Sequence, residues 1–205
     1  RRLDPSDFSI KAPSGAAFAR VRVVEMVTDL VTAERHLSLP LSNGELKPDA
    51  SDGLCKIAAV DRTHIPGKLF TGLIKGFGLT SGAAACSAAW DTSDIVVVGA
   101  DEADMAGAVN RIADLQGGAA LCKGGRVLAE IAMPIFGIAS DLPVATLAAQ
   151  LEEFKHAIRK LGVVFPDPLL SLITLTGAAI PYLRICEEGL VNLKDGRTVG
   201  LFVSE

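Results

Sequence analysis

The stretch Ile95-Val96-Val97-Val98-Gly99-Ala100-Asp101-Glu102 decides the fold of this chain. Its run of β-branched residues, closed by a glycine, predicts a short strand that is buried on both faces. Asp101 then offers an N-cap, and acidic residues in the following turn suit the positive end of a helix dipole. Apolar residues recur at helical spacing at Met105, Ala108, Val109, Ile112 and Leu115, before Gly117-Gly118. The stretch therefore predicts a buried strand followed by an amphipathic helix over 101–116.

Similar elements are predicted on both sides of this unit. A short strand over 57–60 precedes it, and a hairpin of 119–122 with 127–132 follows it. A second amphipathic helix is predicted over 144–161, then a short buried helix over 168–176 and a hairpin of 189–193 with 198–203. The glycines and alanines of 72–89 indicate closely packed backbones.

These elements predict an α/β or α+β fold, in which a mixed β-sheet is covered by two main helices. Residues 1–50 carry many valines and end in turn signals, so they are expected to form a β-rich N-terminal arm. The remaining residues, 51–205, are expected to form one domain.

Composition excludes several classes of protein. The 205 residues are 49% hydrophobic and 21% charged, which excludes intrinsic disorder and a coiled coil. The formal net charge is −4 and there is no basic run, so neither nucleic acid nor an anionic membrane is an expected partner. The longest uncharged stretch, 168–183, is shorter than the ~20 apolar residues that span a bilayer.

Potential metal-binding residues are scattered along the chain. None of the four cysteines belongs to a C-x-x-C pair, and the three histidines are far apart, so we predict no metal site and no disulfide framework. Reduced thiols and a cytoplasmic location are the expectation. His156 is predicted to lie on the solvated face of the second helix, and no partner is predicted for His36. Neither a P-loop nor a dinucleotide-binding glycine motif is present.

Two polar loops lie at the ends of predicted strands, where ligand clefts are often built. The first is Asp61-Arg62-Thr63-His64, and the second is Trp90-Asp91-Thr92-Ser93-Asp94. The alternative for the first loop is a salt bridge on a surface turn. The alternative for the second is that Trp90, the single tryptophan of the chain, fills a core or an interface.

An ordered set of motifs resembles the carboxy-terminal domain of bacterial adenine deaminases, which belong to the amidohydrolase superfamily. The resemblance covers roughly residues 20–193. It is carried by the runs 56–64, 72–79, 84–99, 101–106 and 109–111, and by Gly117-Gly118, Met133-Pro134-Ile135, Asp167-Pro168, Ile180-Pro181 and Gly189-Leu190-Val191.

This resemblance implies a role in the hydrolysis of adenine to hypoxanthine and ammonia. In the family, a (β/α)₈ barrel holds a divalent metal, manganese or iron, which generates the attacking hydroxide. The present chain has no such barrel, and it opens on Arg1-Arg2 without a methionine, so a fragment is the expectation. The domain would pack on the barrel and help to close its active site. No catalytic residue, metal ligand or cofactor is therefore predicted in this chain, which should be inactive alone.

The resemblance also supplies site candidates. The first loop corresponds to a family stretch Glu-Arg-His, with Asp61 for the glutamate and Thr63 inserted. The second corresponds to Ala-His-Asp-Ser-His-Asn, with Trp90 and Ser93 for the histidines and Asp94 for the asparagine. The substrate-binding candidates are therefore Arg62, His64, Trp90, Asp91, Ser93 and Asp94. The two loops are expected to lie side by side, with Trp90 partly exposed, and to line one concavity.

The expected partners are the amidohydrolase barrel, a purine ligand and a second copy of the chain. Two other functions stay open at this point. One is a freestanding purine-binding or regulatory module, and the other is a structural dimerisation domain without catalysis.

Overall fold

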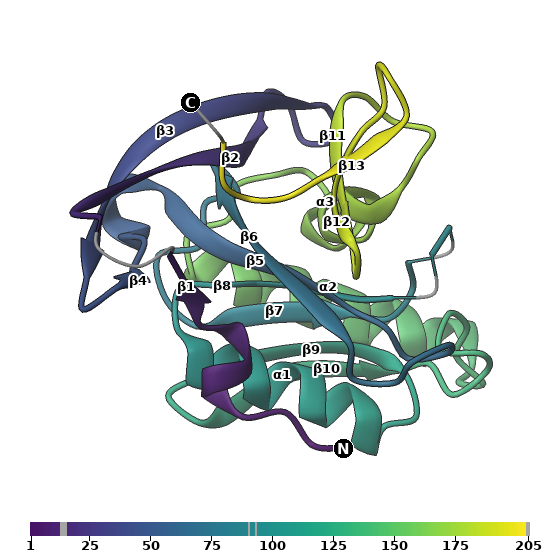
Figure 1. Cartoon of the computed structure of the whole chain (residues 1–205). Helices are drawn as coiled ribbons and strands as arrows, with labels where there is room; N and C mark the ends of the chain where they lie inside the picture. The colour runs from purple at the N-terminus through teal and green to yellow at the C-terminus, as the bar shows by residue number, and fades with distance from the viewer. Residues whose placement is uncertain (13–15, 90, 93, 204–205) are drawn as a thin grey trace.

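The computed structural model describes residues 1–12, 16–89, 91–92 and 94–203. Two β-sheets are formed by these residues, one of ten strands and one of three (Figure 1). The order in the large sheet is β1-β4-β3-β2-β6-β5-β8-β7-β9-β10, and in the small sheet β11-β12-β13. Neighbours in the large sheet are antiparallel except β2 and β6, which run parallel, so the predicted mixed sheet is confirmed.

The predicted helices and strands are present, with shifts of a few residues at their ends, and β6, β7 and β11 are strands that the sequence patterns did not predict. The strands of the large sheet are β1 (Ile10–Lys11), β2 (Phe18–Met26), β3 (Thr32–Ser42), β4 (Glu45–Leu46), β5 (Leu54–Val60), β6 (Leu69–Lys75), β7 (Ala83–Cys86), β8 (Ile95–Gly99), β9 (Gly118–Lys123) and β10 (Arg126–Ala132). The small sheet contains β11 (Leu183–Cys186), β12 (Gly189–Asn192) and β13 (Arg197–Val199). The α-helices are α1 (Glu102–Asp114), α2 (Val144–Lys160) and α3 (Pro168–Ile173), and short 3₁₀ turns span Pro5–Phe8, Ala50–Asp52 and Thr174–Thr176.

Strand β8 and helix α1 form as their sequence predicts. The side chain of Asp101 accepts a hydrogen bond from the amide of Asp104 at 3.0 Å, which is the expected N-cap. Alternate residues of β8 point to opposite faces of the sheet. Val97 packs in a cluster with Met105 and Val109 of α1, whereas Val96 and Val98 belong to the cluster that contains residues of α2 and α3. The helices therefore cover both faces of the sheet.

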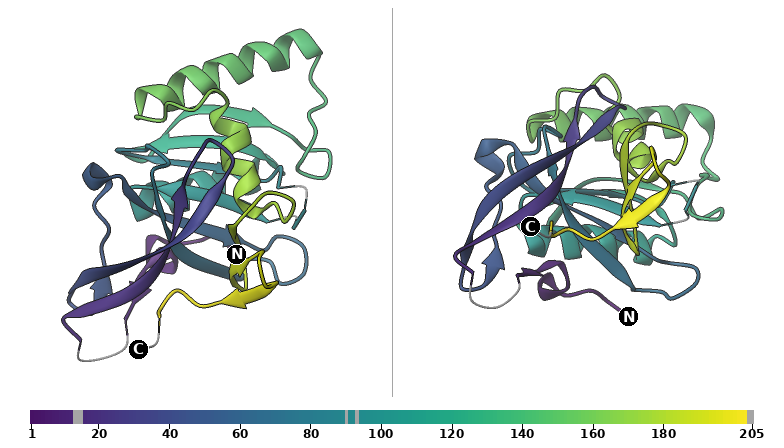
Figure 2. Two further views of the ribbon diagram at one scale, coloured as in Figure 1. Left: turned by 90° about the horizontal axis from the view of Figure 1, so that it is seen from above. Right: turned by 45° about the horizontal axis from the view of Figure 1, so that its top comes forward.

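Helix α2 is confirmed over nearly its full predicted length, but its apolar stripe is only partly buried. It packs mainly against β10, with Phe154 and Ile158 fully buried (Figure 2). At its first turn, Val144 is 83% exposed. Helical spacing identifies the apolar face of a helix, but it does not say how far the sheet extends beneath it.

The β-rich arm is confirmed as a long antiparallel hairpin of β2 and β3. Its strand β2 is tied to two distant parts of the chain, through parallel pairs with β6 and a bridge between Val21 and Phe202. The prediction that His36 has no partner is wrong, because its Nε2 lies 2.8 Å from Oε1 of Glu34. Residues two apart in a strand share a face, so this contact is local. His156 is exposed on α2, as predicted.

Candidate functional site

The first polar loop is built around a buried carboxylate. Asp61 directly follows β5 and is 3% exposed. Its carboxylate accepts hydrogen bonds from the backbone amides of Thr63, His64 and Ile65, at 2.7, 2.9 and 2.6 Å. Burial by itself would raise the pKa of Asp61, but together these three amides outweigh it and hold the pKa at about 2. Asp61 therefore fixes the turn that presents His64.

His64 is a candidate whose side chain reaches into solvent. Its side chain is 83% exposed, and Nδ1 lies 3.0 Å from the hydroxyl of Thr63. The imidazole therefore sits on a fixed turn with one ring nitrogen engaged. Nε2 is the atom left to meet a ligand or another domain.

The second polar loop places a buried carboxyl group, that of Asp94, beside the first polar loop. Asp94 directly precedes β8, is 2% exposed, and its Oδ2 has no hydrogen-bond partner among the residues that the structure describes. Burial raises its pKa to about 6. The nearby hydroxyl of Thr92 and amide of Glu187 oppose this rise, while the negative charges of Glu187 and Asp61 add to it. Asp94 is therefore an acid that changes its charge near neutral pH.

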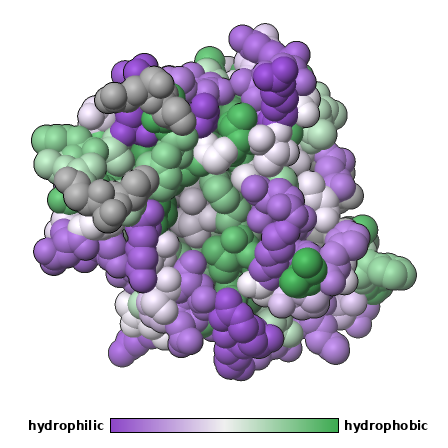
Figure 3. Space-filling model, in the orientation of Figure 1, coloured by the Kyte–Doolittle hydropathy of each residue, from purple (hydrophilic) through white to green (hydrophobic). Residues whose placement is uncertain are grey.

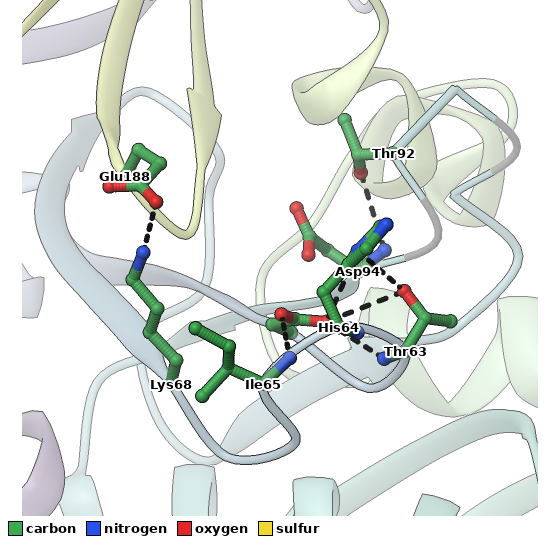
Figure 4. A network of polar contacts seen from close by, with 8 residues as sticks. Thr63, His64, Ile65, Lys68, Thr92, Asp94 and Glu188 are labelled. Atoms are coloured by element: carbon green, nitrogen blue, oxygen red, sulfur yellow. Dashed lines mark hydrogen bonds and ion pairs between the residues drawn. The ribbon is translucent and has the colours of Figure 1, made fainter.

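The described parts of the two loops lie side by side, as predicted. Strands β5 and β8 are antiparallel neighbours with Val60 opposite Ile95, so Asp61 and Asp94 leave the sheet at the same end. Figure 4 shows His64 of the first loop beside Asp94 of the second. The tip of the β11–β12 hairpin joins them, because Lys68 of the loop after β5 forms an ion pair with Glu188. The loops lie at the ends of central strands of the sheet rather than at an outer strand.

The candidates at this end contact different neighbours. The Nη2 of Arg62 donates to the carbonyl of Phe136 at 2.6 Å, and Oδ2 of Asp91 accepts from the amide of Ala178 at 3.0 Å. A hollow of about 240 Å³ is lined by residues that include Asp61 and Arg62, but His64, Asp91 and Asp94 are not among them. Trp90 and Ser93 lie outside the described residues. One shared concavity for all six candidates therefore stays a prediction.

Two groups at this end were missed by reasoning from the sequence. One is the hairpin tip with Glu187 and Glu188, and the other is the segment 133–139 that Arg62 contacts. Both reach the loops through contacts between residues more than 70 positions apart, which no local pattern reports. The run Met133-Pro134-Ile135 was visible as a motif, but nothing in it indicates a contact with Arg62.

Comparison with known proteins places this sequence in a family. A family model described as the adenine deaminase C-terminal domain matches residues 29–197. The chain is 40% identical over 194 residues to an adenine deaminase of Methylobacterium nodulans, covering 95% of this chain and 34% of that protein. It is 39% identical to one of Desulfatibacillum aliphaticivorans, over 98% of this chain and 35% of that protein. An adenine deaminase of Brucella melitensis is 34% identical over 97% of this chain, which covers 34% of that protein.

The chain belongs to the adenine deaminase C-terminal domain family. It spans about a third of the length of the adenine deaminases that it matches. The match confirms the resemblance drawn from the sequence motifs.

The family resemblance implies a divalent metal in the barrel, and the described residues of this adenine deaminase C-terminal domain do not offer a second site that would fit one. Within residues 1–12, 16–89, 91–92 and 94–203, no three His, Cys, Asp or Glu side chains gather as metal ligands would. All four cysteines are free thiols, and burial raises the pKa of Cys86 to about 12, which disfavours the thiolate that a metal needs. In the same part of the chain, no helix is long and apolar enough to cross a membrane.

Proposed function

We propose that this chain is the domain that packs on the metal-bearing barrel of an adenine deaminase and helps to close its active site. On this proposal, the barrel carries out the hydrolysis of adenine to hypoxanthine and ammonia, and the present domain supplies part of the pocket wall. The observation that carries the proposal is the pairing of polar loops at one end of the sheet in a domain that makes up a third of its relatives. A cytoplasmic location is in keeping with four free thiols.

The path of the N-terminal segment also supports packing of the barrel at the end of the sheet that carries the polar loops. Residues Arg1 and Leu3 line the hollow of about 240 Å³ together with Pro66 and Gly67, which belong to the turn that follows His64. Leu3 is held on α1 by two backbone hydrogen bonds with the side chain of Asn110, at 2.9 and 2.8 Å. A polypeptide entering through Arg1 would therefore arrive beside the first polar loop.

Among the described candidates, His64 is the residue best placed to reach a purine held by the barrel. Asp61 fixes its backbone, and its ring projects away from the sheet. A histidine in this position can donate to or accept from a ring nitrogen of the base. Trp90 remains a candidate for stacking on the same base.

The proposal is tested in a hybrid enzyme. This chain would replace the matching third of the Methylobacterium nodulans adenine deaminase, and the conversion of adenine would be followed by ultraviolet absorbance. We expect the hybrid to deaminate adenine. His64→Ala should lower kcat/KM about tenfold, as expected for the loss of one hydrogen bond.

His156→Ala serves as the matched control, because His156 is an exposed histidine on α2 and lies outside both loops. It should leave kcat/KM unchanged. A hybrid in which His64→Ala and His156→Ala are equally harmless would remove the support for a pocket wall at the polar loops.

A further inference from the structure

An exposed apolar segment follows β10 at the same end of the domain. We call residues 133–139 the Phe136 loop. Phe136 is 83% exposed, and its neighbours Ile135 and Ile138 are each 47% exposed. In the space-filling view, apolar side chains form a projection at the right margin, where Figure 1 shows the segment that follows β10 (Figure 3). Three large apolar residues so close in sequence rarely stay in water without a partner.

The backbone of the Phe136 loop is nevertheless firmly held. The carbonyl of Phe136 accepts from Arg62, and the carbonyl of Gly137 accepts from the buried hydroxyl of Ser87 at 2.6 Å. Ile135 and Ala139 form a β-bridge across the turn, with two hydrogen bonds of 3.1 Å. The side chains are thus displayed on a rigid support, which lowers the entropy lost when a partner binds.

Phe136 itself has a backbone conformation that a bulky residue rarely takes. Its φ is 53°, in the left-handed region, which costs an aromatic residue free energy. The next residue, Gly137, has φ 74°, and a Cβ there would lie 2.8 Å from Nη1 of Arg62. The guanidinium therefore packs directly on this turn. The left-handed conformation of Phe136 persists because the surrounding contacts enforce it, and it leaves the phenyl ring exposed to solvent.

Arg62 links the Phe136 loop to the first polar loop. It stays a candidate for binding substrate, and its guanidinium also supports the Phe136 loop through the hydrogen bond to the carbonyl of Phe136. The first polar loop therefore contacts the Phe136 loop through Arg62, and its next turn exposes another apolar side chain, Ile65, which is 60% exposed.

We propose that the Phe136 loop is the main docking contact of this domain, and that its occupant is the preceding two-thirds of an adenine deaminase. This inference rests on the proposed function. The relatives continue for about two-thirds of their length beyond the part matched here. Arg1 lies against Gly67, in the loop that also holds Arg62, so a preceding domain would be tethered beside the first polar loop, which contacts the Phe136 loop. A second copy of the chain has no such tether.

The test uses the hybrid enzyme with Phe136→Asn, because asparagine tolerates a left-handed backbone while removing the ring. Val164→Asn is the matched control. Val164 is 85% exposed and follows Val163, which packs against Gly78 beyond the far end of β6. Each hybrid would be unfolded by heat in a calorimeter and digested by a protease that cleaves the junction before Arg1. The isolated chain with Phe136→Asn would be melted alongside.

We expect the unaltered and Val164→Asn hybrids to unfold in one transition, and the Phe136→Asn hybrid to separate into two. Cleavage at the junction should become at least tenfold faster in the Phe136→Asn hybrid, the effect expected for an aromatic hot spot. The isolated chain should melt at the same or a slightly higher temperature with the substitution, because asparagine adopts the left-handed backbone at lower cost, and this shows that folding is intact.

The experiment distinguishes failure of the docking role from failure of the proposed function. A single transition and unchanged cleavage in the Phe136→Asn hybrid would overturn the docking role and leave the proposed function standing. Two transitions in the unaltered hybrid would overturn the proposed function and this inference with it. If the isolated chain sediments as a dimer and Phe136→Asn makes it a monomer, the occupant is a second copy and the inference is wrong.

Discussion

Replacing Asp94 by asparagine is expected to make the domain more stable above pH 6 than the unaltered chain. The carboxyl group is 2% exposed and faces the negative charges of Glu187 and Asp61, so the folded state favours its protonated form. Its pKa is about 6 in the folded state, against 3.8 for an ordinary aspartic acid. The protonated group contributes stability that is fully present below pH 3.8 and is lost as the pH rises through about 6.

The size of the effect follows from the difference between the two pKa values. At about 1.36 kcal/mol for each pH unit between 3.8 and 6, ionisation of Asp94 destabilises the folded state by about 3 kcal/mol. Asparagine has nearly the same shape and does not ionise. The free energies of unfolding of the two proteins should therefore diverge by about 2.4 kcal/mol between pH 4 and pH 7.5, with the variant becoming the more stable relative to the unaltered chain.

Urea unfolding of the isolated domain, followed by circular dichroism at several pH values, measures this difference. Asp52→Asn is the matched control, since it also removes one negative charge but at an exposed position on the Ala50–Asp52 turn. A constant difference between Asp94→Asn and the unaltered chain across this pH range would refute the reasoning. So would an equal divergence for Asp52→Asn.

Four further predictions concern the core, a close backbone contact and the ligands. Val97→Asp should lower the free energy of unfolding by several kcal/mol, because Val97 of β8 is fully buried in the cluster that contains the apolar face of α1. A soluble variant that melts cooperatively would contradict this. Gly118→Ala should lower the free energy of urea unfolding by at least about 3 kcal/mol, because a Cβ there would lie 2.0 Å from the carbonyl oxygen of Ile131. Gly196→Ala is the control: Gly196 has a left-handed φ but open space around it, so the loss should be about 1 kcal/mol. Adenine should change the fluorescence of Trp90 only weakly in the isolated chain, and Trp90→Ala should abolish the response. Elemental analysis of the purified domain should find no tightly bound manganese, iron or zinc, and one such ion per chain would overturn that expectation.

The parts of the fold that the sequence predicts well are those with local causes. The strand at 95–99, the cap at Asp101 and the helix that follows are set by neighbouring residues, and the structure reproduces them almost to the residue. The pairing of β5 with β8 could be anticipated from two short apolar strands that each border a polar loop. The family motifs then indicated that these loops belong together.

The rest of the site depends on contacts that sequence patterns do not report. The pKa of Asp94 depends on Glu187, from a hairpin more than 90 residues away, and on burial by the whole end of the domain. Likewise, the sequence suggests a substrate or a local salt bridge as the partner of Arg62, and only the folded chain shows that the carbonyl of Phe136 accepts its hydrogen bond. Polar residue types can be listed from a sequence, but their partners are selected by tertiary packing.

The bridge between Val21 and Phe202 has a consequence for how the chain is made by the ribosome. The amide of Arg22 donates to the carbonyl of Leu201 at 2.8 Å, and the amide of Val203 donates to the carbonyl of Arg20 at 2.9 Å. The β2–β3 hairpin is synthesised well before residues 201–203, so residues 20–22 of β2 lack these partners until that segment emerges. During translation the hairpin therefore presents an unpaired strand edge, a form in which strands can pair with other chains. Chains that stop before residue 200 should therefore be prone to aggregation.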